Sequence, residues 1–293
     1  MENLLKTNSI TIIGTLKDVV ITNGVRTTGD KYVKAVATVT SVIKGVTNEF
    51  EISFISSELT QEKKQNQLYA TYSNMGTFKG KKVEISGSLR ENRYFSTRSE
   101  QIVSAITLNG RFIRTVVDDT EDCAKFELGG FLVKSLTERK NKVGEIYLYE
   151  VVMGIANYQN DNMSSYTLHV RPTDKEIING LSNYTIGQTF SLNGTLNFIT
   201  QTITREDDSE GGFGQKVVRT FTNRQHNLWI EGGSAVVTDP GMMYSGDLVR
   251  SLVAAFKAKD VELSANAKDK VASTSVDETP SAPVVTQRQT SLI

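Results

Sequence analysis

One stretch of alternating hydrophobic and polar residues occurs twice along the chain. It reads GKKVEISGSLRENR over Gly80–Arg93 and GQTFSLNGTLNF over Gly187–Phe198, with glycines and a leucine at matching positions. Alternation with a period of two predicts a strand with one buried face. A glycine inside such a strand marks a bulge or a sharp bend, which is how the strands of a small barrel turn a corner. The pattern therefore predicts the same bent strand twice, with the bends at Gly87 and Gly194.

The segments around this strand also occur twice, in the same order. Each copy follows three strand-like segments and a helix-like segment, and it precedes a fifth strand. Three strands, a helix and two strands are the order of the OB-fold, a five-stranded Greek-key barrel that is partly open. The sequence therefore predicts a mainly β protein with two tandem OB-folds, in which the first helix covers Ser57–Met75. The other predicted strands are Ile10–Leu16, Tyr32–Ile43, Glu49–Ile55 and Glu100–Leu108 in the first repeat, and Phe126–Leu132, Glu145–Ala156, Ser165–Val170 and Val217–Gln225 in the second.

Charge and composition divide the chain into four predicted parts. Residues 1–117, the first barrel, hold 16 Lys and Arg against 10 Asp and Glu, whereas residues 118–236, the second barrel, hold 11 against 16. Residues 237–272 form a linker and a C-terminal helix over Asp247–Lys259, which we expect to dock on its own barrel rather than on a partner. Residues 273–293 are rich in Ser, Thr, Pro, Val and Gln and predict a disordered tail. Two similar folds of opposite charge imply different tasks, or mutual attraction.

The overall composition narrows the class of protein. A hydrophobic fraction of 38% and a charged fraction of 23% are typical of a soluble globular protein. No apolar run approaches the roughly 18 residues of a membrane span, and the first residues lack a secretory apolar core. The single cysteine, Cys123, excludes an internal disulfide, and its acidic neighbours predict an unreactive thiol. These features predict a cytoplasmic protein with no membrane partner.

Residues that would carry catalysis or hold a cofactor are scarce. The two histidines, His169 and His226, belong to no metal-binding pair, and the single cysteine completes no zinc site. The acidic run Glu206–Glu210 lacks the ligand spacing of a calcium loop. No phosphate-loop signature occurs. We therefore expect no catalytic residues, no metal and no cofactor, so that the protein is not an enzyme.

Cations and aromatic residues occur together in the first repeat. Single-stranded nucleic acid is held without sequence readout when bases stack on aromatic rings and cations contact the phosphates. Tyr32 and Lys34 alternate on the outward face of the second strand, and Lys79–Arg98 covers the fourth strand and its connection to the fifth. The alternatives are a surface tyrosine at position 32 and a hairpin tip that folds back over its own barrel. The predicted DNA-binding residues are Tyr32, Lys34, Lys81, Lys82, Arg90, Arg93, Tyr94, Phe95 and Arg98.

The second repeat differs from the first in its apolar and acidic segments. Ile146–Met153 is apolar almost without a break, which predicts burial on both faces, against the other barrel, the C-terminal helix or a second copy of the chain. Glu206–Glu210 is acidic where the first repeat is basic, and this charge opposes phosphate binding. The only tryptophan, Trp229, lies in the apolar stretch LWI and is predicted to be a core residue.

The hairpin that begins at Gly80 resembles that of a known family. Gly80–Arg90, with Tyr94 after it and a fifth strand at Ile102–Leu108, is similar to the hairpin between strands four and five of bacterial and phage single-stranded-DNA-binding proteins. Their pattern is G-x-x-V-x-(V/I)-x-G-x-L-R, followed by a basic and aromatic hairpin. The resemblance implies an OB-fold protein that coats single-stranded DNA in DNA replication, recombination and repair, without catalysis or a cofactor, and that can meet replication or recombination proteins.

The chain departs from that family in three places. It holds two barrels, whereas the common bacterial form has one barrel per chain and is tetrameric. The second repeat has Asn197 where the pattern has arginine, and the tail carries Arg288 in place of an acidic tip that recruits partner proteins. The first two departures favour a divergent, phage-type member, which would act in the cytoplasm of a bacterial host. The third leaves the usual partners of the tail open.

Two other functions are also compatible with the sequence. Zero net charge and an acidic second repeat fit a structural or protein-interaction protein, such as a virion component or an adaptor, that uses its OB-folds without binding DNA. A nuclease is the weakest alternative. An oligomer is compatible with each of them.

Overall fold

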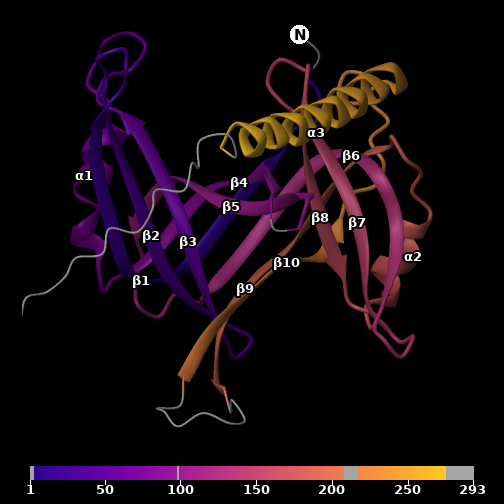
Figure 1. Ribbon diagram of the computed structural model, residues 1–293, viewed down its shortest axis with the longest axis horizontal. Coiled ribbons are helices and arrows are strands. Elements are labelled where there is room, and N and C mark those ends of the chain that lie inside the picture. The colour runs from indigo at the N-terminus through magenta and orange to yellow at the C-terminus, as the bar shows by residue number, and fades with distance from the viewer. Residues whose placement is uncertain (1–2, 98, 208–216, 275–293) are drawn as a thin grey trace, which may run out of the picture.

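Ten strands form one continuous sheet that closes into two barrels, which lie side by side in Figure 1. The computed structural model describes residues 3–97, 99–207 and 217–274, and it describes their side chains apart from those of 200–224 and 268–274. The neighbour order in the first barrel is β2-β3-β5-β4-β1, and a further pairing of β1 with β2 closes it. Its elements are β1 (Asn8–Val25), β2 (Lys31–Ile43), β3 (Val46–Ser57), α1 (Gln67–Ser73), the 3-10 helix η1 (Met75–Phe78), β4 (Lys82–Ser96) and β5 (Gln101–Thr115).

The second barrel repeats this topology. Its neighbour order is β6-β7-β8-β10-β9, and a pairing of β6 with β9 closes it. Its elements are β6 (Cys123–Lys140), β7 (Ile146–Ala156), β8 (Met163–Val170), α2 (Lys175–Ser182), β9 (Thr189–Asp207) and β10 (Val217–Gly233), and α3 (Gly246–Thr274) follows. Five strands in this order, with a helix between the third and the fourth, are the OB-fold. The prediction of two tandem OB-folds and a C-terminal helix is confirmed, whereas the division into domains at residues 117 and 236 stays a prediction.

The interior of the first barrel follows the alternation of the sequence. Every second residue of β2 is fully buried, and these residues are small or β-branched, which suits a narrow barrel. The residues between them point outward, among them Lys34. The buried set is Val33, Ala35, Ala37, Val39 and Ser41, which agrees with the predicted outward position of Lys34.

The two repeated glycines lie where neighbouring backbones come closest. A Cβ atom on Gly87 would lie 1.9 Å from the carbonyl oxygen of Asn109, and one on Gly194 would lie 1.9 Å from that of Trp229. The pairing register shifts beside both glycines, between β4 and β5 and between β9 and β10. The predicted bends are therefore confirmed, and no other residue fits at either bend without a movement of the facing strand.

Each barrel contacts the other through its hairpin, and the first strands of the two barrels pair. β1 pairs with β6 antiparallel, with Ile10 opposite Phe126. The β4–β5 hairpin reaches the second barrel, where the carbonyl of Leu89 accepts a hydrogen bond from the hydroxyl of Tyr166 (3.1 Å). The β9–β10 hairpin reaches the first barrel, where the N–H of Phe198 donates to Oδ1 of Asn48 (2.9 Å). One apolar core therefore runs through both barrels.

The first helix is much shorter than predicted. Residues 58–66 form turns and a short bridge between Leu59 and Gln65, and Leu59 is exposed. α1 begins after Asn66 because the side chain of Asn66 accepts a hydrogen bond from the N–H of Leu68 (3.0 Å) and so caps the helix. Tyr72 lies in the core, and its hydroxyl donates to the carbonyl of Arg111 (2.7 Å).

The C-terminal helix docks on the second barrel of its own chain, as predicted, and then continues across the molecule (Figure 1). Its first turns cover an apolar cluster, and later turns contact β8, β4 and β5. The prediction that β7 is buried on both faces is confirmed only in part. Val151–Ala156 is almost wholly buried, but Tyr147 is exposed. Residues 275–293 of the predicted tail lie outside the described residues. The apolar cluster at the contact between α3 and this barrel consists of Leu4, Phe131, Ala156, Met163, Tyr244, Val249 and Leu252.

No helix in the described ranges is long and apolar enough to cross a membrane.

Candidate nucleic-acid interface

A groove follows the outer face of the first barrel over β2, β3 and β5. At one end two cations, Lys34 of β2 and Arg90 of β4, flank a floor of polar and apolar side chains. Ser53 and Thr107 in this floor also line a second hollow, so the two hollows are adjacent. We call the whole depression the strand groove and this end its cationic end. The remaining residues of the cationic end are Phe54, Ile55, Asn92 and Asn109.

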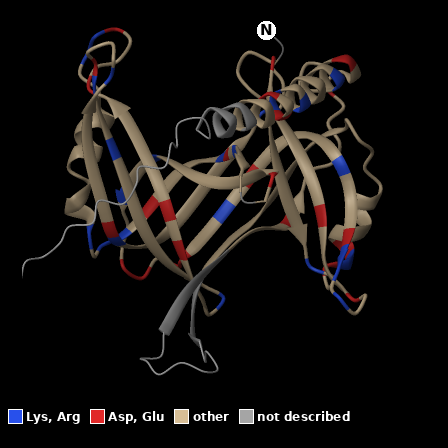
Figure 2. Ribbon diagram, viewed as in Figure 1, with Lys and Arg blue, Asp and Glu red and all other residues tan. Residues whose placement is uncertain are grey.

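The other end of the strand groove is acidic and is built by both barrels. Glu49 and Glu51 of β3 line it together with Phe198 and His226 of the β9–β10 hairpin. Acidic positions are visible on β3 towards the point where β9 meets it (Figure 2). We call this part the acidic end. Its remaining residues are Thr38, Ser53, Ile106, Thr107 and Leu108.

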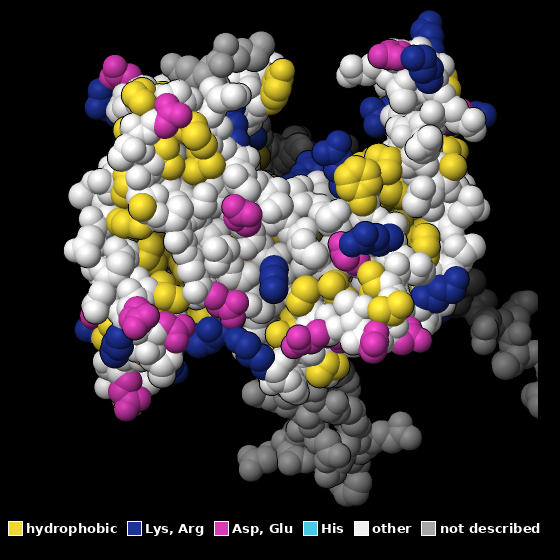
Figure 3. Space-filling model, turned by 180° about the vertical axis from the view of Figure 1, so that it is seen from behind, with side chains coloured by type: hydrophobic (Ala, Val, Ile, Leu, Met, Phe, Trp, Pro, Cys, Tyr) yellow, Lys and Arg dark blue, Asp and Glu magenta, His cyan; other side chains and the backbone are white. Residues whose placement is uncertain are grey.

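The cationic end has the charge that a phosphate backbone requires. The side chains of Lys34 and Arg90 are exposed, and neither makes a hydrogen bond or an ion pair within the described residues. On the face opposite to that of Figure 1, basic and acidic side chains are interspersed and neither forms a broad patch (Figure 3). A phosphate backbone would therefore meet two local cations at the cationic end.

The hairpin β4–β5 divides the predicted contact residues between its two sides. Along β4 the more exposed residues are Arg90, Asn92 and Tyr94, and the less exposed ones that alternate with them include Arg93 and Phe95. Successive side chains of a strand point to opposite faces, so Arg90 and Tyr94 share one face and Arg93 and Phe95 share the other. Tyr94 is 46% exposed. The sequence grouped these residues correctly in one hairpin but did not separate its two faces.

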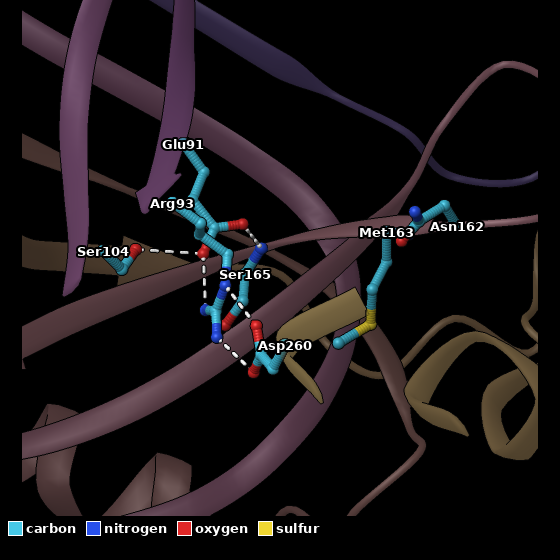
Figure 4. A network of polar contacts seen from close by, with 7 residues as sticks. All are labelled: Glu91, Arg93, Ser104, Asn162, Met163, Ser165 and Asp260. Atoms are coloured by element: carbon cyan, nitrogen blue, oxygen red, sulfur yellow. Dashed lines mark hydrogen bonds and ion pairs between the residues drawn. The ribbon is translucent and has the colours of Figure 1, made fainter. Parts of the chain in front are cut away.

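Arg93 is an internal anchor and does not face the strand groove. Its guanidinium makes a bidentate contact with the carboxylate of Asp260 in α3, with Nε–Oδ1 at 3.0 Å and Nη2–Oδ2 at 2.5 Å (Figure 4). Nη1 donates to Oε1 of Glu91 (2.9 Å), and the ring of Phe256 lies 4.1 Å from Cζ. Although burial disfavours the charged form, the hydrogen bonds to Asp260 and Glu91 raise the pKa of Arg93. The expectation of an arginine that is free for phosphate is therefore corrected.

Glu91 connects this cluster to the second barrel. Its Oε1 also accepts a hydrogen bond from the hydroxyl of Ser104 on β5 (2.9 Å), and its Oε2 accepts one from the N–H of Ser165 on β8 (2.7 Å) (Figure 4). The side chain of Glu91 is only 4% exposed. The cluster of Glu91, Arg93 and Asp260, which we call the hairpin anchor, thus joins the hairpin, β8 and α3.

The two lysines at the start of β4 lie away from the strand groove. Lys82 is largely buried in an ion pair with Asp122 (2.8 Å), and the other oxygen of Asp122 accepts from the N–H of Val42 (2.6 Å). Lys82 therefore links β4 to the segment that connects the two barrels, and its charge is already paired. Lys81, just before β4, is exposed but lines neither hollow of the groove.

Tyr32 is also not in the groove lining. The ring of Tyr32 packs over Gly24 of β1, so closely that a Cβ atom there would lie 2.5 Å from Cζ. The alternative of a surface tyrosine describes this position better than a stacking platform. Arg98 lies outside the described residues, as do Asp208–Glu210 of the acidic loop in the second repeat.

Trp229 is on the outer face of the second barrel, and its prediction as a core residue is wrong. It is half-buried between Leu228 and Ile230, which are buried. The guanidinium carbon of Arg171 lies 4.7 Å from its ring centre, and the ring of His169 lies 5.8 Å away. Burial lowers the pKa of His169. Strict alternation along β10 would have predicted this orientation, because both neighbours of the tryptophan face inward.

The described part of the chain holds no group of three or more His, Cys, Asp or Glu side chains that could bind a metal ion. Cys123 is half-buried, and burial, with smaller contributions from Glu84 and Asp122, raises the pKa of its thiol despite the opposing charge of Lys125. This agrees with the predicted unreactive cysteine.

Comparison with known proteins gives a family and distant structural likenesses. No curated protein matches the sequence. Wild-type single-stranded DNA binding protein from Thermus aquaticus is 14% identical with a TM-score of 0.47, and the match covers 83% of this chain and 98% of that chain. A deletion mutant of the same protein is also 14% identical, with a TM-score of 0.48, and covers 80% and 97%. At this identity and TM-score, the likeness says nothing about what this chain binds. The model of one family, YorF, matches residues 6–267, which is most of the sequence, and the chain therefore belongs to the YorF family.

Proposed function

We propose that the strand groove binds single-stranded DNA with little dependence on sequence. The observation that carries the proposal is the pair of exposed cations, Lys34 and Arg90, that flank the cationic end without any ion pair in the described part of the chain. Phosphate contacts by Lys and Arg supply most of the affinity of such proteins and do not distinguish sequences.

The floor of the groove is better suited to contacts with bases than to contacts with phosphates. It mixes hydroxyl and amide groups with exposed apolar surface, including Ile55, which is 61% exposed. The exposed ring of Tyr94 lies on the same face of β4 as Arg90 and offers a stacking surface. A duplex keeps its bases paired and inside, so it cannot use such a floor. The proposed contacts are thus Lys34, Arg90, Asn92 and Tyr94.

We further propose that binding protects single-stranded DNA during replication, recombination or repair in the cytoplasm of a bacterial host, as in a phage-type member of the resembled family. Binding alone would suffice for this role, without catalysis or a cofactor. Replication or recombination proteins are proposed as further partners.

A titration of wild-type protein tests the proposal. A labelled mixed-sequence 30-mer, single-stranded or as a duplex, is titrated at low salt and followed by fluorescence anisotropy. We expect micromolar or tighter binding of the single strand, weaker binding of the duplex, and a steep loss of affinity with added salt. A flat single-strand titration at micromolar protein would disprove the proposal.

A flat titration would favour the second candidate, a structural or adaptor protein. The acidic end of the groove, with Glu49 and Glu51, is the observation on its side, because carboxylates suit a basic peptide better than a phosphate. Sedimentation as a regular oligomer, or capture of one specific protein partner, would then be expected.

A further inference from the structure

We propose that the acidic end of the strand groove is a base-selective subsite, in which the carboxylate of Glu51 favours bases with an exocyclic amino group over thymine and uracil. The inference rests on the proposed single-strand binding and adds a chemical preference to it. Cytosine, adenine and guanine are the bases that carry such a group.

Glu51 is the carboxylate that is available to a ligand. Of the two acids at this end, Glu49 is engaged in an ion pair with Lys17 (2.8 Å). Glu51 is exposed and makes no hydrogen bond or ion pair with any residue that the structure describes. An ionised carboxylate only accepts hydrogen bonds. A ligand that satisfies Glu51 in this hollow must therefore present a donor.

A flat aromatic pair lines the same hollow as Glu51. The ring of His226 stacks on that of Phe198 at 4.1 Å with an interplanar angle of 7°, and both residues line the hollow. Phe198 is only 3% exposed and packs on Phe50 of the first barrel, at 5.5 Å between ring centres. The exposed imidazole is thus backed by a fixed ring. A planar base can stack against such a surface while its edge reaches the floor.

The charges of the groove set the orientation of a strand within it. Glu49 and Glu51 repel a phosphate backbone, whereas Lys34 and Arg90 attract it. A single strand along the groove therefore keeps its phosphates near the cationic end and turns a base, rather than a phosphate, towards Glu51.

Base chemistry then decides which nucleotide fits. A carboxylate accepts a hydrogen bond from the amino group N4 of cytosine, and the amino groups of adenine and guanine can donate in the same way. Uracil and thymine carry the oxygen O4 in place of the amino group. Their single ring donor, N3–H, lies between two carbonyl oxygens that repel a carboxylate. The subsite should therefore discriminate most clearly between cytosine and uracil, which have the same ring size.

The test compares the homopolymers (dC)20 and (dU)20 by anisotropy at pH 7.5 and one salt concentration. Wild-type protein should bind (dC)20 about fivefold more tightly, the lower end of the range for one specific base contact. Glu51→Gln should bring the ratio close to one and should tighten binding of (dU)20, because the amide can donate to O4. Glu262→Gln, at an exposed position of α3 outside the groove, changes the net charge equally and should keep the wild-type ratio.

The possible outcomes separate this inference from the proposed function. Equal binding of both homopolymers by the wild type, or an unchanged ratio in Glu51→Gln, overturns the base-selective subsite but leaves single-strand binding intact. Binding of neither homopolymer at low salt overturns both. Because Glu51 is exposed, thermal melts of the two variants should match the wild type, which excludes loss of fold as the cause.

Discussion

The hairpin anchor makes Arg93 a determinant of stability and not of DNA binding, and this can be tested by Asp260→Asn and Arg93→Ala. Arg93 and Asp260 are mostly buried, with 19% and 27% of their side chains exposed. Asp260→Asn weakens two hydrogen bonds but leaves Arg93 paired with Glu91 and stacked on Phe256. Hydrogen bonds to charged groups contribute about 1.5–3 kcal/mol. Because both side chains are partly exposed to solvent, we expect a loss near the lower value, about 1.5 kcal/mol of unfolding free energy.

Arg93→Ala should cost more than Asp260→Asn. It removes the cation that pairs with Glu91, a carboxylate that is 4% exposed, and breaking a buried ion pair in this way costs about 3–5 kcal/mol. Glu91 keeps its hydrogen bonds from Ser104 and Ser165, so we expect a value near about 3 kcal/mol.

Urea unfolding of the wild type, both variants and their double mutant measures these losses. The double mutant should lose less than the sum of the single changes, because the two residues share one interaction. Glu262→Gln is the control and should not change stability. In DNA titrations, Arg93→Ala should leave the slope of affinity against salt unchanged. A slope that falls by about 0.7, the value for one phosphate contact on a single strand, would refute this account of Arg93.

Three further predictions follow from single positions. Tyr94→Ala should weaken single-strand binding about fivefold to a hundredfold because it removes a stacking surface, whereas Tyr158→Ala, at an 87% exposed position outside the groove, should not change the affinity. Gly87→Ala should lower the melting temperature strongly, because its Cβ would lie 1.9 Å from a carbonyl oxygen, whereas Gly76→Ala meets no atom within 4 Å and should melt as the wild type does. The hydrogen bond from Arg139 lowers the pKa of Glu150 from its usual 4.5, so this carboxylate adds stability that is complete above pH 4.5 and is lost as the pH falls through the lowered pKa. The stability difference between wild type and Glu150→Gln, measured by urea unfolding, should therefore shrink below pH 4.5, and a difference that is constant with pH would contradict this.

Most of the fold could be predicted from local sequence pattern. The alternation in β2 correctly predicted which side chains fill the first barrel, and the repeated glycines marked both bends, because each is a property of one strand and its neighbour. The length of the first helix was overestimated because the polar segment of residues 58–66 has no apolar periodicity that would distinguish a helix from turns. The cap at Asn66 was the signal for the true start.

The candidate site was less predictable, because it depends on segments that meet only in the folded chain. Arg93 and Asp260 are separated by 167 residues, and nothing local to either one indicates the other. The same holds for His226 and Phe198, which the second barrel contributes to the groove of the first. The positions of Lys34 and Arg90 could be predicted, since alternation alone places them on outer faces.

The most direct test of the account is the affinity of Lys34→Ala/Arg90→Ala for a mixed-sequence single strand, measured over a range of salt concentrations beside Lys81→Ala. If the strand groove holds the phosphate backbone, the double variant should bind more weakly, and its salt slope should fall by about 1.4, for two contacts. Lys81→Ala, an exposed cation at the other end of β4, should bind as the wild type does. Equal losses of affinity and slope per cation removed at all three positions would mean that DNA follows general surface charge, and would contradict the assignment of the groove.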